Sequence, residues 1–131
     1  MRYMMLIYTK ETEAAAAEDM RAVSAAHWAI MDETARRGIL RGTDPLEPTT
    51  TATTVRVQDG KIVVTDGPFA ETKEQLAGYY ILECKDIDEA LEWAARIPSS
   101  CGGSPGCVEV RPIHEIRKPA LESTSSEYAK A

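Results

Sequence analysis

The spacing of hydrophobic positions changes along the chain, and the first two spacings predict a strand and a helix. In the segment of residues 2–8, both alternating sets of positions from residue 3 onward are aromatic or aliphatic, which is typical of a strand with two covered faces. Between residues 14 and 37 the inward positions recur every three or four residues, at Met20, Val23, His27, Ile30 and Thr34. This period predicts one amphipathic helix. Gly38 follows two arginines and is a suitable left-handed stop for that helix.

The middle of the chain has the pattern of a β-hairpin. Residues 53–57 and 61–65 are rich in valine, isoleucine and threonine, and the connection between them contains Asp59-Gly60. An Asp-Gly pair adopts the positive φ angles of a tight hairpin turn. Before the hairpin, residues 39–41 begin a second strand, and residues 42–48, with two prolines and a glycine, are predicted to be a turn.

The remaining pattern predicts a strand, a helix and a final strand. Residues 78–84 are mostly apolar or aromatic and are predicted to form a strand. Asp86 is a suitable N-terminal cap for a helix over residues 87–97. The positions of this helix expected to face the core are Ile87, Leu91 and Ala94. Apolar and charged side chains alternate over residues 108–112, which predicts the last strand.

The order of elements is strand, helix, strand, inserted hairpin, strand, helix, strand. Two βαβ-type halves around one antiparallel sheet predict an α+β fold, the ferredoxin-like plait, with an inserted β-hairpin and both helices on one face. The other face needs a cover, because the first strand is apolar on both sides. We therefore expect a homodimer that joins the open faces of two sheets.

Length and charge narrow the function classes. The 131 residues suit one domain, and we expect residues 1–117 to form it and residues 118–131, which lack apolar periodicity, to be a flexible C-terminal tail. With 15 Lys+Arg against 21 Asp+Glu the net charge is −6, which argues against nucleic-acid binding. The apolar runs are far shorter than the ~18 residues of a membrane span, and no export signal opens the chain. We expect a cytoplasmic protein with no membrane contact.

The sequence lacks the patterns of a metal or cofactor site. Three cysteines without an export signal predict reduced thiols. No metal is expected, because Cys101, Cys107 and the two histidines do not have the spacing of zinc ligands. The glycine-rich residues 102–106 precede a strand rather than a helix, unlike a nucleotide-binding loop, so no cofactor is expected.

Residues 64–80, with Asp66-Gly67-Pro68-Phe69 near their start, closely resemble the signature of the DGPF-domain proteins, a branch of the YCII-related family. Residues 2–4, 51–56, 91–98 and 108–112 also resemble this family. The resemblance implies a dimeric α+β barrel with a cleft for a small molecule. Most members of the DGPF branch have no assigned reaction, and some accompany extracytoplasmic-function sigma factors. One YCII-related branch contains an enzyme of chlorinated-aromatic breakdown.

His27 and Asp66 are the candidate catalytic residues. His27 lies on the sheet-facing side of the predicted helix, and its placement resembles that of a helix histidine in YCII-related proteins, for which the resemblance implies a His–Asp active site. A histidine held by a carboxylate can move protons in an elimination, isomerisation or hydrolysis. The alternatives are a core histidine bonded to a backbone carbonyl and an aspartate that only builds the turn.

Further candidates for substrate binding lie close to Asp66 or on the adjoining strands. They are Arg56, Gly67, Pro68, Phe69, Lys73 and Tyr79. The Gly-Pro pair leaves neighbouring amides accessible to a ligand, and a basic side chain can hold a substrate carboxylate. The alternatives are a well-built turn, solvated surface charges and an aromatic core residue.

Two classes of function are left open by these residues. One is an enzyme without a redox cofactor, with His27 as acid and base and Asp66 as its partner. The other is a non-catalytic binding or regulatory module that senses a small molecule or contacts a partner protein, with a sigma factor as the partner that the resemblance implies.

Overall fold

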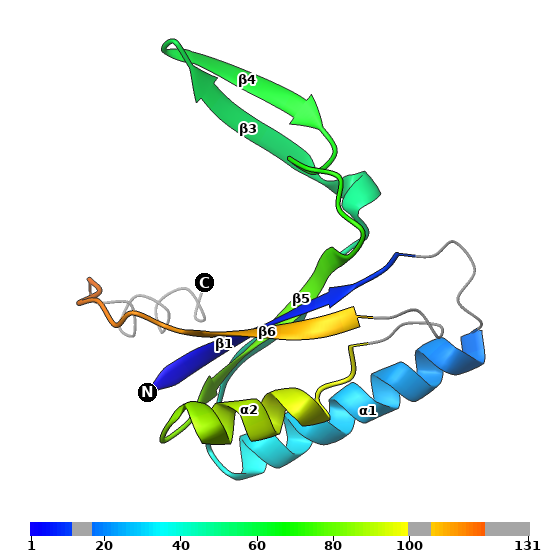
Figure 1. The fold of residues 1–131 in the computed structure, drawn as a ribbon, viewed down its shortest axis with the longest axis vertical. Helices are drawn as coiled ribbons and strands as arrows, with labels where there is room; N and C mark the ends of the chain where they lie inside the picture. The colour runs from blue at the N-terminus through cyan, green and yellow to red at the C-terminus, as the bar shows by residue number, and fades with distance from the viewer. Residues whose placement is uncertain (12–16, 100–105, 120–131) are drawn as a thin grey trace, which may run out of the picture.

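The structure is a computed structural model that describes residues 1–11, 17–99 and 106–119 (Figure 1). In chain order the elements are β1 (Arg2–Thr9), α1 (Ala17–Arg36), β2 (Leu40–Pro45), the 3₁₀ turn η1 (Thr49–Thr51), β3 (Thr53–Gln58), β4 (Lys61–Asp66), β5 (Gln75–Glu83), α2 (Ile87–Arg96) and β6 (Gly106–Pro112). The first three residues of the predicted helix and residues 120–131 of the predicted tail lie outside the described residues.

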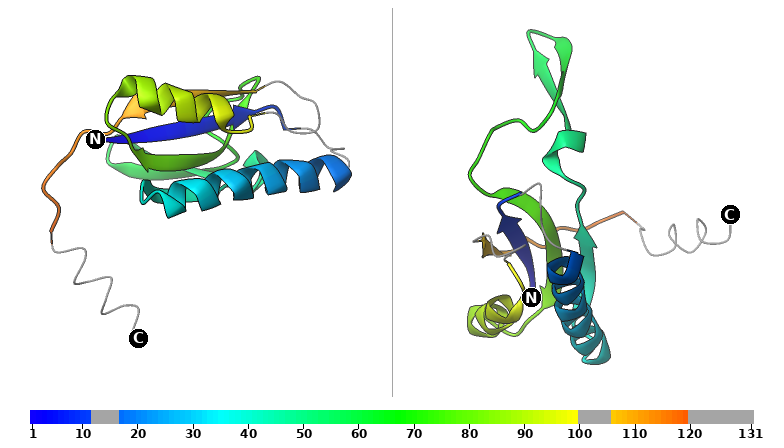
Figure 2. Two further views of the ribbon diagram at one scale, coloured as in Figure 1. Left: turned by 90° about the horizontal axis from the view of Figure 1, so that it is seen from below. Right: turned by 90° about the vertical axis from the view of Figure 1, so that its right-hand side faces the viewer.

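The main sheet has the strand order β2-β5-β1-β6, and all neighbouring strands are antiparallel. Both helices lie on the same face of this sheet, as the right-hand view of Figure 2 shows. This connectivity is that of the ferredoxin-like plait, so the predicted α+β fold is confirmed. The pair of β3 and β4 is inserted between β2 and β5, which confirms the predicted hairpin.

The hydrophobic core lies between the sheet and the two helices. Alternate residues of β1 and β5 supply most of its sheet side, namely Tyr3, Met5, Ile7, Tyr80 and Leu82. Ile30 of α1 and Trp93 of α2 cover them from the helix layer, each 5% exposed. Because side chains alternate along a strand, the intervening residues lie on the opposite, open face of the sheet. Met4, Leu6 and Ile81 are among them and are only partly covered.

The C-terminus of α1 and the N-terminus of α2 lie where local sequence signals predict them. Gly38 has a φ of +74°, its amide donates to the carbonyl of Ala35, and the next amide donates to the carbonyl of Thr34, which together close α1 with a Schellman turn. At the start of α2 the Asp86 carboxylate accepts the amide of Glu89 at 2.9 Å. Within the described part of the chain, neither helix combines the length and apolar character that crossing a membrane requires.

The second strand is longer than the sequence predicts. β2 continues through Gly42 to Pro45, where the prolines and glycine indicate a turn. A bulge between Leu40 and Gly42 absorbs one residue, and the strand then pairs with β5 up to Gly78. Because β2 is an edge strand, the missing amide of Pro45 removes no bond of the sheet.

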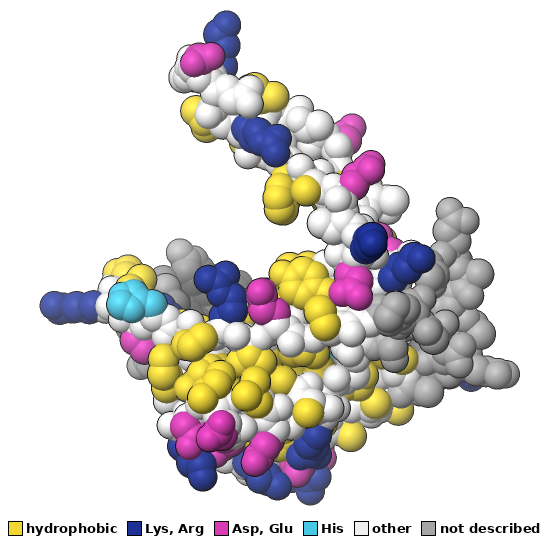
Figure 3. Space-filling view, in the orientation of Figure 1, with side chains coloured by type: hydrophobic (Ala, Val, Ile, Leu, Met, Phe, Trp, Pro, Cys, Tyr) yellow, Lys and Arg dark blue, Asp and Glu magenta, His cyan; other side chains and the backbone are white. Residues whose placement is uncertain are grey.

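The predicted core face of α2 is also wrong in two of its three positions. Ile87 is 43% and Leu91 is 50% exposed, whereas Ala90, Trp93 and Ala94 are buried. The helix is rotated so that the large indole of Trp93 enters the core. In Figure 3 the hydrophobic side chains between β6 and α2 form a visible patch on the surface.

The hairpin is built as its turn residues predict and projects from the body of the molecule. Asp59 and Gly60 have φ angles of 51° and 75°, the two positive values of a tight hairpin turn. The strands pair from Thr53 opposite Asp66 to Gln58 opposite Lys61. Figures 1 and 2 show the hairpin on the side of the sheet that carries no helices.

Candidate functional site

A cavity of about 360 Å³ lies between α1 and the β2–β5 edge of the sheet. About two turns of α1 form its helix wall, with Ser24, His27, Trp28 and Met31. These residues lie along one side of the helix because Ser24 and Met31 are each three or four residues from both His27 and Trp28. Trp28 is at the rim and is 68% exposed. The sheet wall includes Ile7 and Tyr80.

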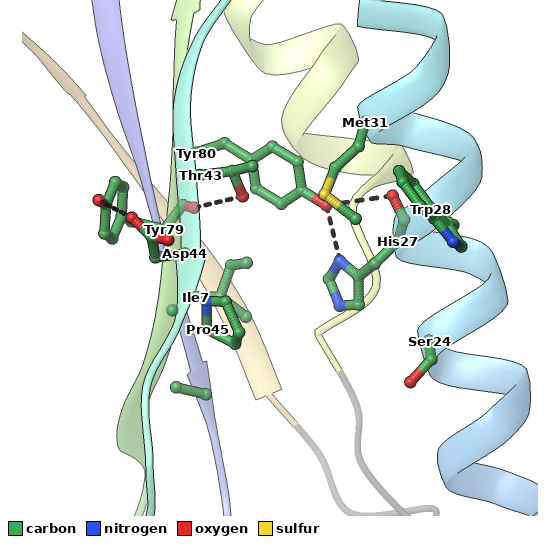
Figure 4. A pocket seen from close by; sticks show the side chains of 12 residues that line it. Ile7, Ser24, His27, Trp28, Met31, Thr43, Asp44, Pro45, Tyr79 and Tyr80 are labelled. Carbon is green, nitrogen blue, oxygen red and sulfur yellow. Dashed lines mark hydrogen bonds between the residues drawn. The ribbon is translucent and has the colours of Figure 1, made fainter. Parts of the chain in front are cut away.

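The ring of His27 is held by Tyr80. Nδ1 of His27 lies 2.8 Å from the Tyr80 hydroxyl, and the two rings are stacked with centroids 5.9 Å apart and planes 21° apart. The same hydroxyl lies 3.4 Å from the main-chain oxygen of His27 and is positioned to donate to it. In Figure 4 the other ring nitrogen, Nε2, points away from Tyr80 and into the space between α1 and the strands. The histidine therefore has one fixed nitrogen and one that faces the cavity.

Burial keeps both members of this pair uncharged near pH 7. It lowers the pKa of His27 from its ordinary value of 6.5. Burial also raises the pKa of Tyr80 to about 12. No other titratable side chain of the described residues points into the cavity, because Asp44 and Tyr79 contribute their backbones to it and turn their side chains to the open face of the sheet. There the Tyr79 hydroxyl donates to the Asp44 carboxylate at 2.6 Å.

The lowered pKa of His27 predicts a dependence of stability on pH. Because the unfolded chain binds this proton more tightly than the folded one, the contribution of His27 to the free energy of unfolding is expected to be fully present above pH 6.5. It falls as the pH drops from 6.5 toward the lowered pKa. Urea denaturation across this range, compared with His27→Gln, measures the difference, and the Gln variant is expected to lose that part of the slope. Equal slopes in the two proteins would contradict the assignment.

A family model for the YCII-related domain matches residues 1–117 of the chain. The chain belongs to the YCII-related family. An uncharacterised protein of Rhizobium meliloti (strain 1021) is 41% identical over 125 residues, which cover 94% of this chain and 100% of that protein. Among solved structures, the chain is similar to 5-chloro-2-hydroxyhydroquinone dehydrochlorinase from Burkholderia phenoliruptrix in complex with 2,5-dihydroxybenzoquinone. The identity is 14%, the TM-score is 0.45, and the match covers 87% of this chain and 94% of that chain.

Of the residues predicted for the site, this YCII-related structure places two at the cavity. His27 lines it with its ring and Tyr79 with its backbone. The others do not line it, namely Arg56, Asp66, Gly67, Pro68, Phe69 and Lys73. Asp66 ends β4 at the base of the hairpin, and among the hydrogen bonds of the described residues none joins it to His27. Within one chain the expected His–Asp pair is not brought together.

Residues 66–69 build the base of the hairpin in this structure. Gly67 has a φ of +95°, its amide donates to the carbonyl of Ala52 at 2.8 Å, and its carbonyl accepts the Thr54 hydroxyl at 2.8 Å. Phe69, two residues later, is 77% exposed. This geometry supports the alternative that Asp66-Gly67-Pro68-Phe69 builds a turn, since a φ of +95° at residue 67 strongly favours glycine.

Sequence reasoning missed Tyr80 as the partner of His27 and missed Ser24 and Trp28 as wall residues. The alternation of side chains along a strand could have identified Tyr80, because Tyr79 and Tyr80 must face opposite sides of the sheet and only one of them can face α1. The pairing of Tyr80 with Met5 identifies which of the two faces the helices. Over the described ranges, no three His, Cys, Asp or Glu side chains cluster as a metal ion would require.

Proposed function

We propose that this protein is a DGPF-branch member of the YCII-related family that binds a small uncharged molecule in the cavity beside His27 and exchanges a proton with it. The observation that carries the proposal is the geometry of the imidazole. Its Nδ1 is held at 2.8 Å by Tyr80, while its Nε2 faces a cavity of about 360 Å³. The DGPF assignment rests on the likeness of residues 66–69 to that branch.

The contacts of the Tyr80 hydroxyl support either role for Nε2. If the hydroxyl donates to the main-chain oxygen of His27, Nδ1–H donates to the hydroxyl and Nε2 has the free electron pair of a base. If the hydroxyl donates to Nδ1, Nε2 carries the proton of an acid. A base that takes a proton from the ligand and returns it elsewhere supports isomerisation or elimination. Tyr80 is a positioning residue in this scheme.

The walls of the cavity support an uncharged ligand of about the size of one substituted ring. A volume of about 360 Å³ is near the lower end of small-molecule pockets, and its walls are mostly apolar and aromatic. Transfer of an ion into such a site is unfavourable without a partner charge. Arg56 and Lys73, the candidate anchors for a carboxylate, are exposed and outside the cavity.

The experiment is a thermal-shift titration with three probes that share a ring and differ in charge: benzyl alcohol, benzoate and benzylamine. Benzyl alcohol is expected to raise the melting temperature most, since a ligand that binds only the folded state stabilises it. Ser24→Phe, which fills the cavity, is expected to abolish the shift. Ala25→Phe adds the same ring at a neighbouring exposed position outside the cavity and is the control. A shift that survives in Ser24→Phe would contradict the proposed site.

One observation favours a second function, that of a binding or regulatory module without catalysis. Apart from Tyr80, His27 is the single titratable side chain of the described residues that faces the cavity, and no carboxylate supports it there. A sensor of a small molecule needs the cavity but not the proton transfer. A sigma factor is the partner proposed for such a module, on the resemblance to the DGPF branch alone.

We also propose that two copies join through the open faces of their sheets. The centre of this face is apolar, with Met4, Leu6 and Ile81, while Glu109 and Arg111 of β6 lie at its side. An apolar centre with charged residues at the rim is typical of protein interfaces.

A further inference from the structure

The hairpin of β3 and β4 has one face that is entirely aliphatic between its ends. The strand register pairs Val55 with Val64 and Val57 with Ile62, so all four side chains lie on the same face. Their exposed fractions are 61%, 61%, 71% and 74%. The intervening pairs, Arg56 with Val63 and Gln58 with Lys61, put mostly polar side chains on the other face.

This division into two faces is typical of a sheet with one covered side. A two-stranded ribbon by itself is only marginally stable in water, and among the described residues these strands pair only with each other. A contiguous row of exposed aliphatic side chains is also rare on a soluble surface unless it binds something. We therefore expect a binding partner to cover the aliphatic face.

The base of the hairpin holds it on the open side of the sheet. The bonds of Gly67 to Ala52 and Thr54 close this base. Just before it, the Glu11 carboxylate accepts the amide and the hydroxyl of Thr49 at 2.8 and 2.7 Å, which ties the start of η1 to the segment that follows β1. Figures 1 and 2 show the hairpin beyond the helix-free face. Any molecule seated on that face is thus within reach of the hairpin.

A second copy of the chain is the occupant that the surfaces fit. The open face and the hairpin are two apolar surfaces of one chain on the same side of the sheet, and in a two-fold dimer each surface occurs twice. Charge does not oppose the contact at the hairpin. In a chain of net charge −6, residues 53–66 contain two basic residues, Arg56 and Lys61, and two acidic residues, Asp59 and Asp66.

We propose that the β3–β4 hairpin is a dimerisation arm that packs its aliphatic face against a second copy seated on the open face of the sheet. This inference rests on the proposed homodimer and adds a separate contact to it. Because the arm of each copy contacts the other, every substitution in it acts twice in the dimer.

The test compares two cross-strand pairs of substitutions in the full chain. Val57→Thr with Ile62→Thr makes the aliphatic face polar and keeps β-branched side chains. Arg56→Thr with Val63→Thr is the matched control on the other face, one position along the same strands. Sedimentation of the wild type at micromolar concentration is expected to give about twice 14.4 kDa. The first pair is expected to weaken association by ~100-fold, whereas the control pair leaves it within a few-fold.

Other sedimentation results would contradict the arm, its aliphatic face or the dimer itself. If the aliphatic-face variant dimerises like the wild type, the arm is overturned and the open-face dimer stands. Equal weakening by both pairs overturns the assignment to the aliphatic face. A monomeric wild type overturns both the arm and the dimer, but not the cavity beside His27. Amide exchange is the second measurement: protection of β3 and β4 is expected to fall on dilution below the dissociation constant, and concentration-independent protection overturns the arm.

Discussion

Replacing Trp93 with alanine is expected to lower the free energy of unfolding by about 3–5 kcal/mol, the usual cost of removing a buried aromatic ring. Trp93 is 5% exposed and is part of the core beneath α2. The guanidinium groups of Arg37 and Arg96 lie 5.2 and 4.6 Å from the centre of its ring. Glu33 of α1 accepts hydrogen bonds from both arginines. The indole thus links the two helices as well as filling the core.

The second tryptophan of the chain is the matched control. Trp28 is 68% exposed at the rim of the cavity, so Trp28→Ala is expected to change the free energy of unfolding by less than about 1 kcal/mol. Urea denaturation followed by far-ultraviolet circular dichroism measures both variants. Similar losses for the two variants would show that the core is not organised around Trp93.

Replacing His27 with glutamine is expected to reduce turnover by about 10²–10⁴-fold once a substrate is known, which is the usual contribution of a general acid–base. Glutamine keeps much of the volume and hydrogen-bonding capacity of the side chain but does not titrate. Affinity for benzyl alcohol, measured by the same thermal-shift titration, is expected to stay within a few-fold. Tyr80→Phe keeps the imidazole but removes the hydroxyl at 2.8 Å that orients it. Its effect on turnover is expected to be smaller, with a shifted pH profile.

This pair of variants separates the two candidate functions. Loss of turnover with retained affinity supports the enzyme. A wild-type protein that binds the ligand without converting it, with the same affinity in His27→Gln, supports the binding module. Full turnover in His27→Gln would remove His27 from the chemistry and leave the cavity as a binding site.

The local signals of the sequence predicted the elements that depend on neighbouring residues. Asp59-Gly60 predicted the hairpin turn because its positive φ angles are a property of those two residues. Gly38 and Asp86 predicted the ends of the helices for the same reason. The order of these elements was then sufficient for the ferredoxin-like plait, since few arrangements cover one face of such a sheet.

The errors concern positions that long-range packing decides. β2 extends to Pro45 because β5 offers a free edge there, which overrides the local turn preference. The rotation of α2 is set by the volume of Trp93 against the sheet, so Ile87 and Leu91 are exposed although their spacing suits a core face. Hydrophobic spacing alone does not rank a tryptophan above an isoleucine.

The sequence by itself determined the family, the plait and the inward face of His27, because these follow from residue identities and short periods. Only the tertiary structure decided what His27 meets. Tyr80 reaches it through the pairing of β5 with β1 and β2, while Asp66 remains on a hairpin that projects from the opposite face of the sheet. The pairing of distant strands fixes such contacts, and side-chain spacing along one segment does not contain that information.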